Sequence, residues 1–495
     1  MATKQFDTLV QQLKYRVLKE VARAEWEGTL DENKKNAIPK IISPGPNATM
    51  RCCIYKERAI AHGRVNMACG GNKANPNIIE VIEAACDQCP FGGITVTDMC
   101  RGCLAHRCEQ ACRLNAISFG PDLRCRIDKS KCVNCGMCMK ACQFGAIVNN
   151  KRPCEAACKI NAIHAREDGI AEIDEEKCTR CGQCSYNCPF GAIMDKSFIT
   201  EAIDLVKGSE GGSKYKTYMV IAPSISSQFK YARLTQVITG IKALGFTDVV
   251  EAALGADLVA MNEAKDLSEE GFCTSSCCPA FVRYIQTAFP TLAKDISKNL
   301  SPMAAIAKYI KQTDPTGKVI FCGPCMAKKM EIFREDSKSF VDCVITFEEL
   351  QALIDSKDID VASLEDSPLD NASYFGRIFA RAGGLSDAVA EALKEMGSPF
   401  EVKPVKANGL DQCKMALMQA KSGKLPGNFI EGMACPGGCI GGPACLTHEV
   451  RDPAKVDAYG HESKETTIEG AISSIMADAK IASAEAMPII KSYQK

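Results

Sequence analysis

The sequence predicts an α/β fold with short parallel sheets for residues 215–495, preceded by an α+β domain rich in cysteine. Three observations lead to this prediction. A chain of 495 residues is too long for one core. Short apolar runs alternate with helical patterns after residue 215, and cysteine motifs repeat in the region before it. We therefore divide the chain into four parts: 1–45, 46–97, 98–196 and 215–495.

The N-terminal parts carry no targeting or membrane signal that we recognise. Residues 1–45 are expected to form one polar helix and a linker that ends at the turn Pro44–Gly45–Pro46. The first residues are charged throughout and lack the apolar core of a secretory signal. No run of about 18 apolar residues is present, and a net charge of zero gives no general attraction to nucleic acid. We expect a cytoplasmic protein that binds neither membrane nor nucleic acid.

Residues 98–196 contain four copies of one half-module. Each copy is a cysteine followed four residues later by Ala–Ile, and the copies begin at Cys112, Cys142, Cys158 and Cys188. Thirty cysteines without a secretory signal do not favour a disulfide framework. Zinc is the alternative, but zinc ribbons show two separated cysteine pairs. Triads with two-residue gaps followed by a fourth cysteine are typical of ferredoxins, so we expect iron–sulfur clusters.

At least three [4Fe–4S] clusters are expected from the complete triads and lone cysteines. Their predicted ligands are Cys100, Cys103, Cys108, Cys112, Cys132, Cys135, Cys138, Cys142, Cys158, Cys178, Cys181, Cys184 and Cys188. Which lone cysteine completes which triad stays open. An electron-carrying ferredoxin with no chemistry of its own would explain this region, but not the second half of the chain.

Several cysteines fall outside the triads. One hypothesis is that Cys86, Cys89, Cys154 and one lone cysteine hold a fourth cluster; the alternative is that they are structural or free thiols. Four further cysteines are expected to be small buried apolar residues, namely Cys52, Cys53, Cys69 and Cys125.

The second half begins after a Gly- and Ser-rich segment, residues 208–213, which predicts a linker. Residues 218–222, 318–322 and 341–345 are apolar runs that predict buried parallel strands. Residues 234–246 predict a helix ended by glycine, and residues 467–484 predict a C-terminal helix.

Three short segments in this half have unusual surroundings: Thr274–Ser–Ser–Cys–Cys–Pro–Ala–Phe281, Gly323–Pro–Cys–Met–Ala–Lys–Lys–Met–Glu331 and Glu431–Gly–Met–Ala–Cys–Pro–Gly–Gly–Cys–Ile–Gly–Gly442. Together they resemble the active-site signatures of the [FeFe]-hydrogenases, from about residue 98 to the C-terminus. The resemblance implies an α/β catalytic domain of two lobes with short parallel sheets, preceded by an α+β ferredoxin-like multi-cluster domain. It also implies the H-cluster, a six-iron group in which a [4Fe–4S] cube is joined to a two-iron unit with CO, cyanide and dithiolate ligands.

By position, the resemblance assigns Cys278, Cys325, Cys435 and Cys439 to the cube, with Cys439 bridging to the two-iron unit. Each lies in a Gly- or Pro-rich loop, where the backbone can approach a ligand closely.

Non-cysteine residues of the same segments extend the resemblance. Lys328 matches a lysine that contacts a cyanide ligand, and Glu331, one helical turn on, can hold that lysine in place. Met433 matches a methionine beside a CO ligand, and Ser224 a serine on the opposite wall. Without the resemblance, we would interpret Lys328 and Glu331 as an exposed ion pair on a helix, and Met433 as a residue that fills the core.

A proton path is implied as well. Cys277 matches a free thiol that relays protons, since a thiol is a weak acid. Glu263, Ser297 and Asp266 match the path beyond it, and Glu263 and Asp266 share one helix face. The alternative for each carboxylate is a solvated surface charge.

The sequence departs from the family pattern at several positions. Gly323 replaces a common methionine, Phe281 a common tryptophan and Glu270 an arginine, and an extra serine, Ser275 or Ser276, precedes the cysteine pair. The segment between Glu263 and Cys277 is also shorter than usual. The changes resemble a less studied monomeric subgroup, and they concern the outer proton path rather than the cluster ligands.

The resemblance implies a ferredoxin hydrogenase that interconverts H₂ with protons and electrons. Its implied partners are a ferredoxin or similar electron carrier and the hydrogenase maturation proteins. Two alternatives remain: a hydrogen sensor with low turnover, and an iron–sulfur electron-transfer or assembly protein that lacks the two-iron unit.

Overall fold

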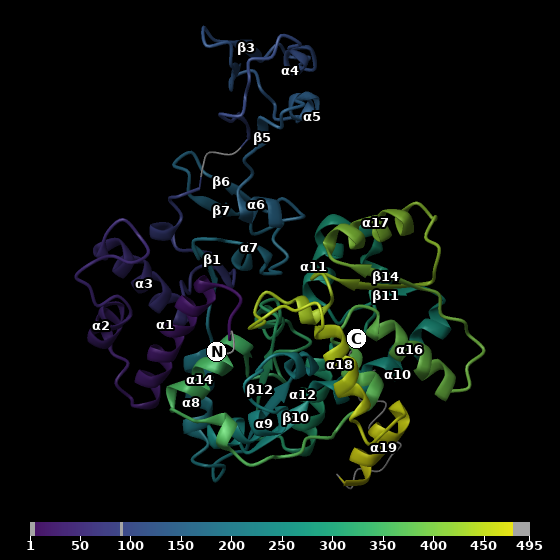
Figure 1. The fold of residues 1–495 in the computed structure, drawn as a ribbon. Helices are drawn as coiled ribbons and strands as arrows, with labels where there is room; N and C mark the ends of the chain where they lie inside the picture. The colour runs from purple at the N-terminus through teal and green to yellow at the C-terminus, as the bar shows by residue number, and fades with distance from the viewer. Residues whose placement is uncertain (1–4, 90–92, 479–495) are drawn as a thin grey trace.

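The computed structural model describes residues 5–89 and 93–478. Figure 1 shows three parts: a group of N-terminal helices, a column of small modules that projects from the molecule, and a larger body of helices and short sheets. Among the described residues, no helix is both long enough and apolar enough to span a membrane.

Three helices form the N-terminal part: α1 (Leu9–Trp26), α2 (Glu32–Ile42) and α3 (Ile54–Ala68). A capping box starts α1, in which the side chains of Thr8 and Gln11 each accept a hydrogen bond from the other's backbone N–H. The expected linker after the first helix is wrong in part, because Asp31 caps a second helix there by accepting from the N–H of Lys34.

The column consists of short antiparallel strand pairs and single helical turns. The pairs are β1 (Ile79–Val81) with β8 (Ile193–Asp195), β2 (Ile94–Val96) with β5 (Ile147–Asn149), β3 (Ile117–Phe119) with β4 (Cys125–Ile127), and β6 (Ile163–Ala165) with β7 (Ala171–Ile173). The helical turns are α4 (Arg107–Gln110), α5 (Met137–Ala141), α6 (Pro153–Ala157) and α7 (Gln183–Tyr186). In every copy of the repeated phrase the Ala–Ile pair is buried. The repeat in the sequence is therefore the repeat of one small core.

One lobe of the body is built on a four-stranded parallel sheet. Its order is β10 (Asp248–Glu251), β9 (Thr217–Ile221), β12 (Lys318–Gly323) and β13 (Cys343–Thr346). The central strands are almost fully buried, as expected for parallel strands covered on both faces. The covering helices are α8 (Ile199–Gly208), α9 (Leu234–Ala243), α12 (Pro302–Thr313) and α14 (Phe347–Ser356). The three strands expected from apolar runs are confirmed.

The other lobe is built on a three-stranded parallel sheet in the order β11 (Cys273–Thr274), β15 (Phe429–Met433) and β14 (Pro404–Asn408). The longest helix, α10 (Ala252–Glu270), contributes residues to the cores of both lobes. The remaining helices are α11 (Pro279–Ala288), α13 (Lys328–Glu331), α15 (Tyr374–Ile378), α16 (Gly384–Glu395), α17 (Leu410–Lys421), α18 (Asp452–His461) and α19 (Ile468–Asp478). The predicted fold of two lobes with short parallel sheets is confirmed; the end of the predicted C-terminal helix lies outside the described residues.

The Gly- and Ser-rich segment 208–213 is a compact turn rather than an extended linker. Gly208 ends α8, and the N–H groups of Gly212 and Lys214 both donate to the carbonyl of Ser209, at 3.0 and 3.1 Å. Positive φ angles at Gly211 and Gly212 allow this reversal. Because α8 already packs in the core of the four-stranded sheet, this turn joins two elements of one lobe and is not a linker between the column and the body.

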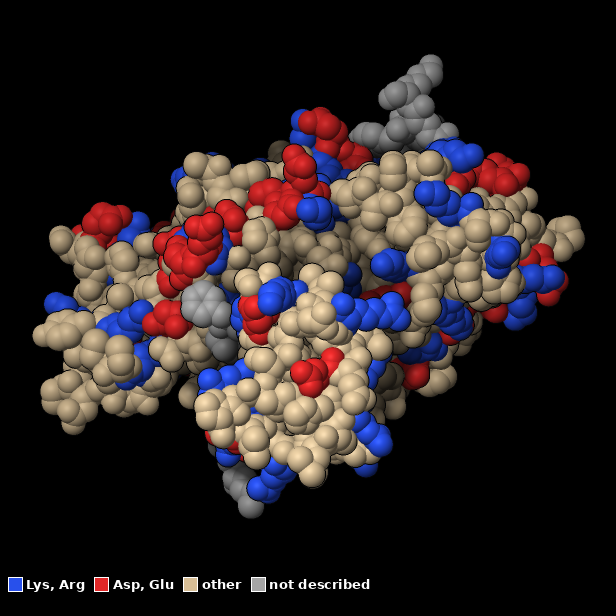
Figure 2. All heavy atoms as spheres, turned by 90° about the horizontal axis from the view of Figure 1, so that it is seen from above, with Lys and Arg blue, Asp and Glu red and all other residues tan. Residues whose placement is uncertain are grey.

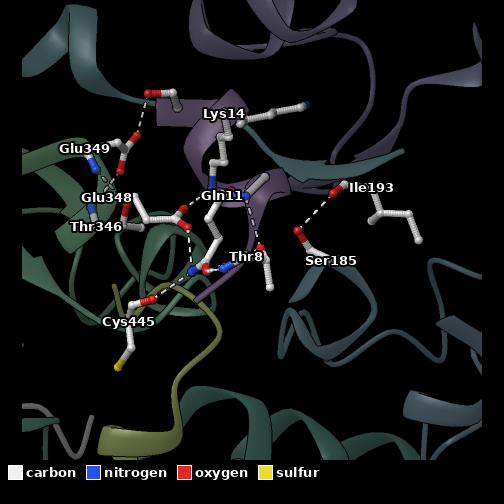
Figure 3. Close-up of polar contacts among 12 residues, drawn as sticks. Thr8, Gln11, Lys14, Ser185, Ile193, Thr346, Glu348, Glu349 and Cys445 are labelled. Atoms are coloured by element: carbon white, nitrogen blue, oxygen red, sulfur yellow. Dashed lines mark hydrogen bonds and ion pairs between the residues drawn. The ribbon is translucent and has the colours of Figure 1, made fainter. Parts of the chain in front are cut away.

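A buried network of charged side chains fastens α1 and the column to the body (Figure 3). Lys14 Nζ lies 2.7 Å from Asp195 Oδ1 and also pairs with Glu348. Lys329 Nζ lies 2.8 Å from the other oxygen of Asp195 and 2.9 Å from Glu349. Lys329 is fully buried, so its charge depends on these partners.

Candidate active site

Loops at the ends of strands bring together the four cysteines assigned to the cube. Cys278 precedes α11, Cys325 follows β12, and Cys435 and Cys439 follow β15. Cys278, Cys325 and Cys439 line one cavity of about 90 Å³. Burial raises the pKa of Cys435, and this cysteine lies close enough to the other three for their charges to raise it further. The carboxyl ends of strands from both sheets therefore meet at one point.

Burial makes these thiols weak acids on their own. Burial, with the charge of neighbouring thiols, raises the pKa of Cys439 to about 11 and that of Cys325 to about 12. A metal would stabilise the thiolate forms, so four converging thiols, of which Cys439 is exposed and the other three are half-buried, suit a metal–sulfur group. The described residues contain no set of three or more Cys, His, Asp or Glu side chains placed to bind a single metal ion. The four cysteines fit a [4Fe–4S] cube, which needs four thiolates.

Glycines shape the loops around these cysteines. A Cβ on Gly441 would lie 1.9 Å from the carbonyl oxygen of Pro436, and a Cβ on Gly442 would lie 2.4 Å from that of Pro324. A Cβ on Gly432 would lie 2.2 Å from the ring of Phe281. Gly323, where the family often has methionine, is equally confined, since a Cβ there would lie 2.8 Å from the ring of Phe321. Both departures from the family pattern are therefore accommodated by local packing.

The cavity is mainly apolar. Of the residues that the resemblance singled out, it is lined by Cys277, Lys328 and Met433 together with the three cysteines. Ala222 and Pro223 form part of the wall, whereas Ser224 is buried beside it and does not line it. The Ser224 hydroxyl has no hydrogen-bond partner among the described residues.

Lys328 is a buried cation with a fixed position. Its Nζ lies 2.5 Å from Glu331 Oε2, and the Ser301 hydroxyl donates to the other oxygen of Glu331. Lys328 and Glu331 are only 8% and 3% exposed, so they do not form a solvated surface pair. Ser301 caps α12, and this helix thereby holds the Lys–Glu pair against the cavity.

Glu263 is buried next to the cavity on the inner face of α10. Neither carboxylate oxygen has a hydrogen-bond partner among the described residues. Burial raises its pKa to about 8, an effect that the nearby Ser297 hydroxyl opposes. Burial, followed by the charge of Glu263, raises the pKa of Cys277. Glu263 is therefore near both Cys277 and Ser297.

The outer part of this path contains a residue that the sequence did not single out. Asn299 Nδ2 donates to Asp266 Oδ2 at 3.1 Å and to Ser297 Oγ at 3.2 Å. Glu270 pairs at the surface with Lys298 at 2.8 Å. An asparagine between two candidate residues carries no sequence signal, because its role follows only from the folded geometry.

The accessory cysteines gather in two regions of the column. Burial raises the pKa of Cys181 to about 11 and also raises that of Cys184, and the charges of Cys178 and Cys158 raise both further. Cys100, Cys108, Cys112, Cys132, Cys138 and Cys142 share a separate small core at the far end. Cys125 is buried as expected, and Cys69 is half-buried. The expectation for Cys52 and Cys53 is wrong: both are exposed, because they precede α3 in a surface loop.

Comparisons with known proteins agree with this arrangement. Residues 215–443 match the family described as iron only hydrogenase large subunit, C-terminal domain. Residues 126–148 and 171–194 match the 4Fe–4S binding domain.

Three relatives illustrate the similarity. Iron hydrogenase 1 of Clostridium pasteurianum is 28% identical over 311 residues, 52% of this chain and 54% of that protein. The NADP-reducing hydrogenase subunit HndD of Solidesulfovibrio fructosivorans is 28% identical over 413 residues, 70% of this chain and 63% of that protein. The cytosolic Fe–S cluster assembly factor NAR1 of Kluyveromyces lactis is 37% identical over 94 residues, 19% of this chain and 20% of that protein. The chain thus spans less than two thirds of the length of each.

A solved structure shares the fold of the body. It is that of HydA(ΔEFG), described as revealing stepwise H-cluster assembly of an [FeFe]-hydrogenase, with a TM-score of 0.50 and 18% identity. The match covers 59% of this chain and 97% of that one. The chain therefore combines 4Fe–4S binding motifs with a region similar to the C-terminal domain of iron-only hydrogenase large subunits.

Proposed function

We propose that the chain is an [FeFe]-hydrogenase that interconverts H₂ with two protons and two electrons at an H-cluster. The observation that carries the proposal is the cavity itself. Three of the four candidate cube cysteines, the buried Lys328 and the thiol of Cys277 face one small apolar space. Neither electron transfer nor storage of a cube requires a buried lysine and a free thiol at such a place.

In this proposal Cys278, Cys325, Cys435 and Cys439 would hold the six-iron group through their thiolates. When bound, the six-iron group supplies the redox-active iron at which hydrogen is split or formed. Lys328 then offers a charge-assisted hydrogen bond to an anionic ligand, while Glu331 and Ser301 fix its ammonium group. Met433, Ala222 and Pro223 keep water out.

Protons need a route between this dry cavity and the surface. Cys277 borders the cavity, and Glu263 lies next to it with a pKa of about 8. A carboxyl group with a pKa near the working pH can both take up and release a proton. Ser297 and Asp266 continue the route outward, and Asn299 positions both of them by donating a hydrogen bond to each.

Electrons would pass along the column to an external carrier. The far module, residues 98–151, carries nine Lys or Arg and four Asp or Glu residues in a chain of zero net charge. Figure 2 looks down on this end of the molecule, where uncharged side chains predominate between basic ones. Leu104 is 95% exposed there. An acidic one-electron carrier such as a ferredoxin fits this surface, and maturation proteins would supply the two-iron unit.

An infrared spectrum of the anaerobically matured chain tests the proposal. CO and cyanide stretching bands that shift under H₂ are expected, together with H₂ turnover. Bands without turnover would favour a hydrogen sensor. Intact iron–sulfur clusters without such bands would instead favour an assembly factor, the alternative raised by the similarity to NAR1.

A further inference from the structure

The column contains two copies of one unit, offset by 46 residues. Cys108 and Cys112 correspond in this way to Cys154 and Cys158, and the triad Cys132/Cys135/Cys138 with Cys142 corresponds to Cys178/Cys181/Cys184 with Cys188. The backbone repeats with the same offset. Strands β3 and β4 become β6 and β7, and the left-handed residue Asn115 (φ 49°) becomes Asn161 (φ 52°).

The second copy lacks two of the cysteines that the first copy has. The positions 46 residues after Cys100 and Cys103 are Ala146 and Asn149. A pair with the same two-residue gap, Cys86 and Cys89, comes instead from the segment before the column.

The structure places Cys86 where the second copy needs its missing first cysteine. In the first copy the N–H of Cys125 donates to Cys100 Sγ at 3.4 Å. In the second copy the N–H of Ala171 donates to Cys86 Sγ at 3.3 Å. Residues 125 and 171 are again 46 apart and lie at the start of β4 and β7. Cys86 therefore occupies the position of Cys100.

The remaining cysteines divide between two groups. Cys158 lies close to the triad Cys178/Cys181/Cys184, because its charge adds to burial in raising the pKa values of Cys181 and Cys184. That leaves Cys188, whose charge raises the pKa values of Cys154 and Cys89 in addition to burial. Cys188, Cys154 and Cys86 share one core with Cys158 and Cys184, so the two groups are neighbours. Exchange of the fourth cysteine between two runs is the arrangement of two-cluster ferredoxins.

Two buried arginines point to a negative group at the same place. Arg64 is 6% exposed and Arg152 2% exposed. Neither pairs with a carboxylate among the residues that the structure describes. Burial lowers the pKa of Arg64, and the charge of Cys188 opposes this effect. Burial raises the pKa of Cys89, and the charge of Arg152 opposes that effect. Arg152 Nε has no hydrogen-bond partner among the described residues. Buried charges are normally paired, and a cluster held by four thiolates would be the missing counter-charge.

We propose that Cys86, Cys89, Cys154 and Cys188 bind a fourth accessory [4Fe–4S] cluster, whose ligands come from two separate segments of the chain. It would lie between the far-end clusters and the cluster at Cys178, Cys181, Cys184 and Cys158, closing the gap in the electron path along the column (Figure 1). The inference rests on iron–sulfur binding by the column and not on hydrogenase activity.

The test uses the full chain, produced without maturation proteins and reconstituted with iron and sulfide in the absence of oxygen. Cys86→Ser/Cys89→Ser should lose about four iron atoms and four sulfides per chain relative to the unaltered protein. The matched control is Cys52→Ser/Cys53→Ser, an exposed pair from the same N-terminal part, which should lose none. Equal iron contents in the two variants would overturn the proposal.

Native mass spectrometry of the unaltered chain decides the matter if the first variant does not fold. The chain should carry five cubes: one at the active site, one for each complete triad and the one proposed here. A maximum of four would overturn the proposal if Cys435→Ala/Cys439→Ala, which removes two active-site ligands, lowers the count to three; a count that stays at four in that variant would show instead that the active-site cube is missing. The iron content and the native mass are both measured before the two-iron unit is installed, so neither depends on whether the chain turns over H₂.

Discussion

At the scale of single residues, Glu263 is the clearest case of a side chain whose environment sets its chemistry. It is 1% exposed on α10, and its carboxylate oxygens have no hydrogen-bond partner among the described residues. Burial penalises the charged form and raises the pKa to about 8. The folded protein therefore keeps this group neutral at a pH where the unfolded chain ionises it.

This difference makes stability depend on pH. Between the unfolded pKa near 4.5 and the folded pKa of about 8, the native state holds the extra proton, so the free energy of unfolding falls as pH rises. The fall should be about 2 kcal/mol between pH 6 and pH 8, and Glu263→Gln should remove it. Thermal unfolding at a fixed scan rate measures the difference, with the exposed Glu269→Gln on the same helix as control. The same slope in both variants would contradict the assignment.

Cys277 tests the inner end of the proposed proton path. Cys277→Ala should reduce H₂ turnover by a factor of 10² or more, because loss of a positioned proton donor costs about that much. The infrared bands and the iron content should stay unchanged, since the thiol is not a proposed ligand. The control is Cys445→Ala, a buried thiol outside the cavity lining. Turnover of Cys277→Ala equal to that of the control would exclude the relay.

At the scale of elements, the sequence predicts well what depends on local pattern. The strands at 218–222, 318–322 and 341–345 follow from apolar runs, because parallel strands covered on both faces need them. The cysteine loops follow from motif spacing. The second N-terminal helix and the compact turn at 208–213 were missed, since Asp31 as a cap and hydrogen bonds to Ser209 outweigh the polar composition.

The site was predicted less completely, for a physical reason. A motif names residues that are near one another in sequence, whereas Ser301, which fixes Glu331, and Asn299, which bridges Ser297 and Asp266, come from the loop before α12. Their roles arise only when that loop packs against two other segments. The sequence shows Cys86 and Cys89 as a cysteine pair outside the triads. Which module they belong to follows only from the hydrogen bond between Cys86 and β7 in the folded chain.

The buried network at Lys329 is the element-scale feature with the largest expected effect on stability. Lys329→Met would leave Asp195 with Lys14 alone and Glu349 without its cation. Breaking a buried pair on one side costs about 3–5 kcal/mol, so the free energy of unfolding should fall by that amount. Lys338→Met, which removes an exposed pair with Glu335, should cost at most about 1 kcal/mol. Denaturant unfolding of the two variants compares them directly, and similar costs would contradict the role of the network.

At the scale of the whole molecule, the N-terminal helix helps to join the column to the body. Gln11 donates to the carbonyl of Cys445 at 2.9 Å and to Glu348 at 3.2 Å (Figure 3). One turn later, Lys14 donates to Asp195 of β8. These contacts fix the triad at Cys178 next to the cube cysteines, and Gln183 Nε2 lies 3.9 Å from Cys435 Sγ. A rigid junction keeps two adjacent cluster sites at a constant separation.

In the proposed function an external carrier would bind at the far end of the column, and the surface there predicts how it would bind. Leu104 is 95% exposed and Leu123 64% exposed among basic side chains, so a protein carrier with an acidic rim gains both apolar contact and charge attraction. Leu104→Glu should therefore raise the apparent KM for a reduced ferredoxin several-fold. A small viologen dye needs no docking surface, and its rate should stay unchanged.

Val450→Glu is the matched control for this prediction, because Val450 is a fully exposed apolar residue on the body instead of the column. It introduces the same charge and should leave both rates unaltered. The attraction should also weaken with salt, since exposed charges are screened within about 8–10 Å at ordinary ionic strength. Equal KM values for the two variants would mean that electrons enter the molecule elsewhere, and the basic far module would then need another explanation.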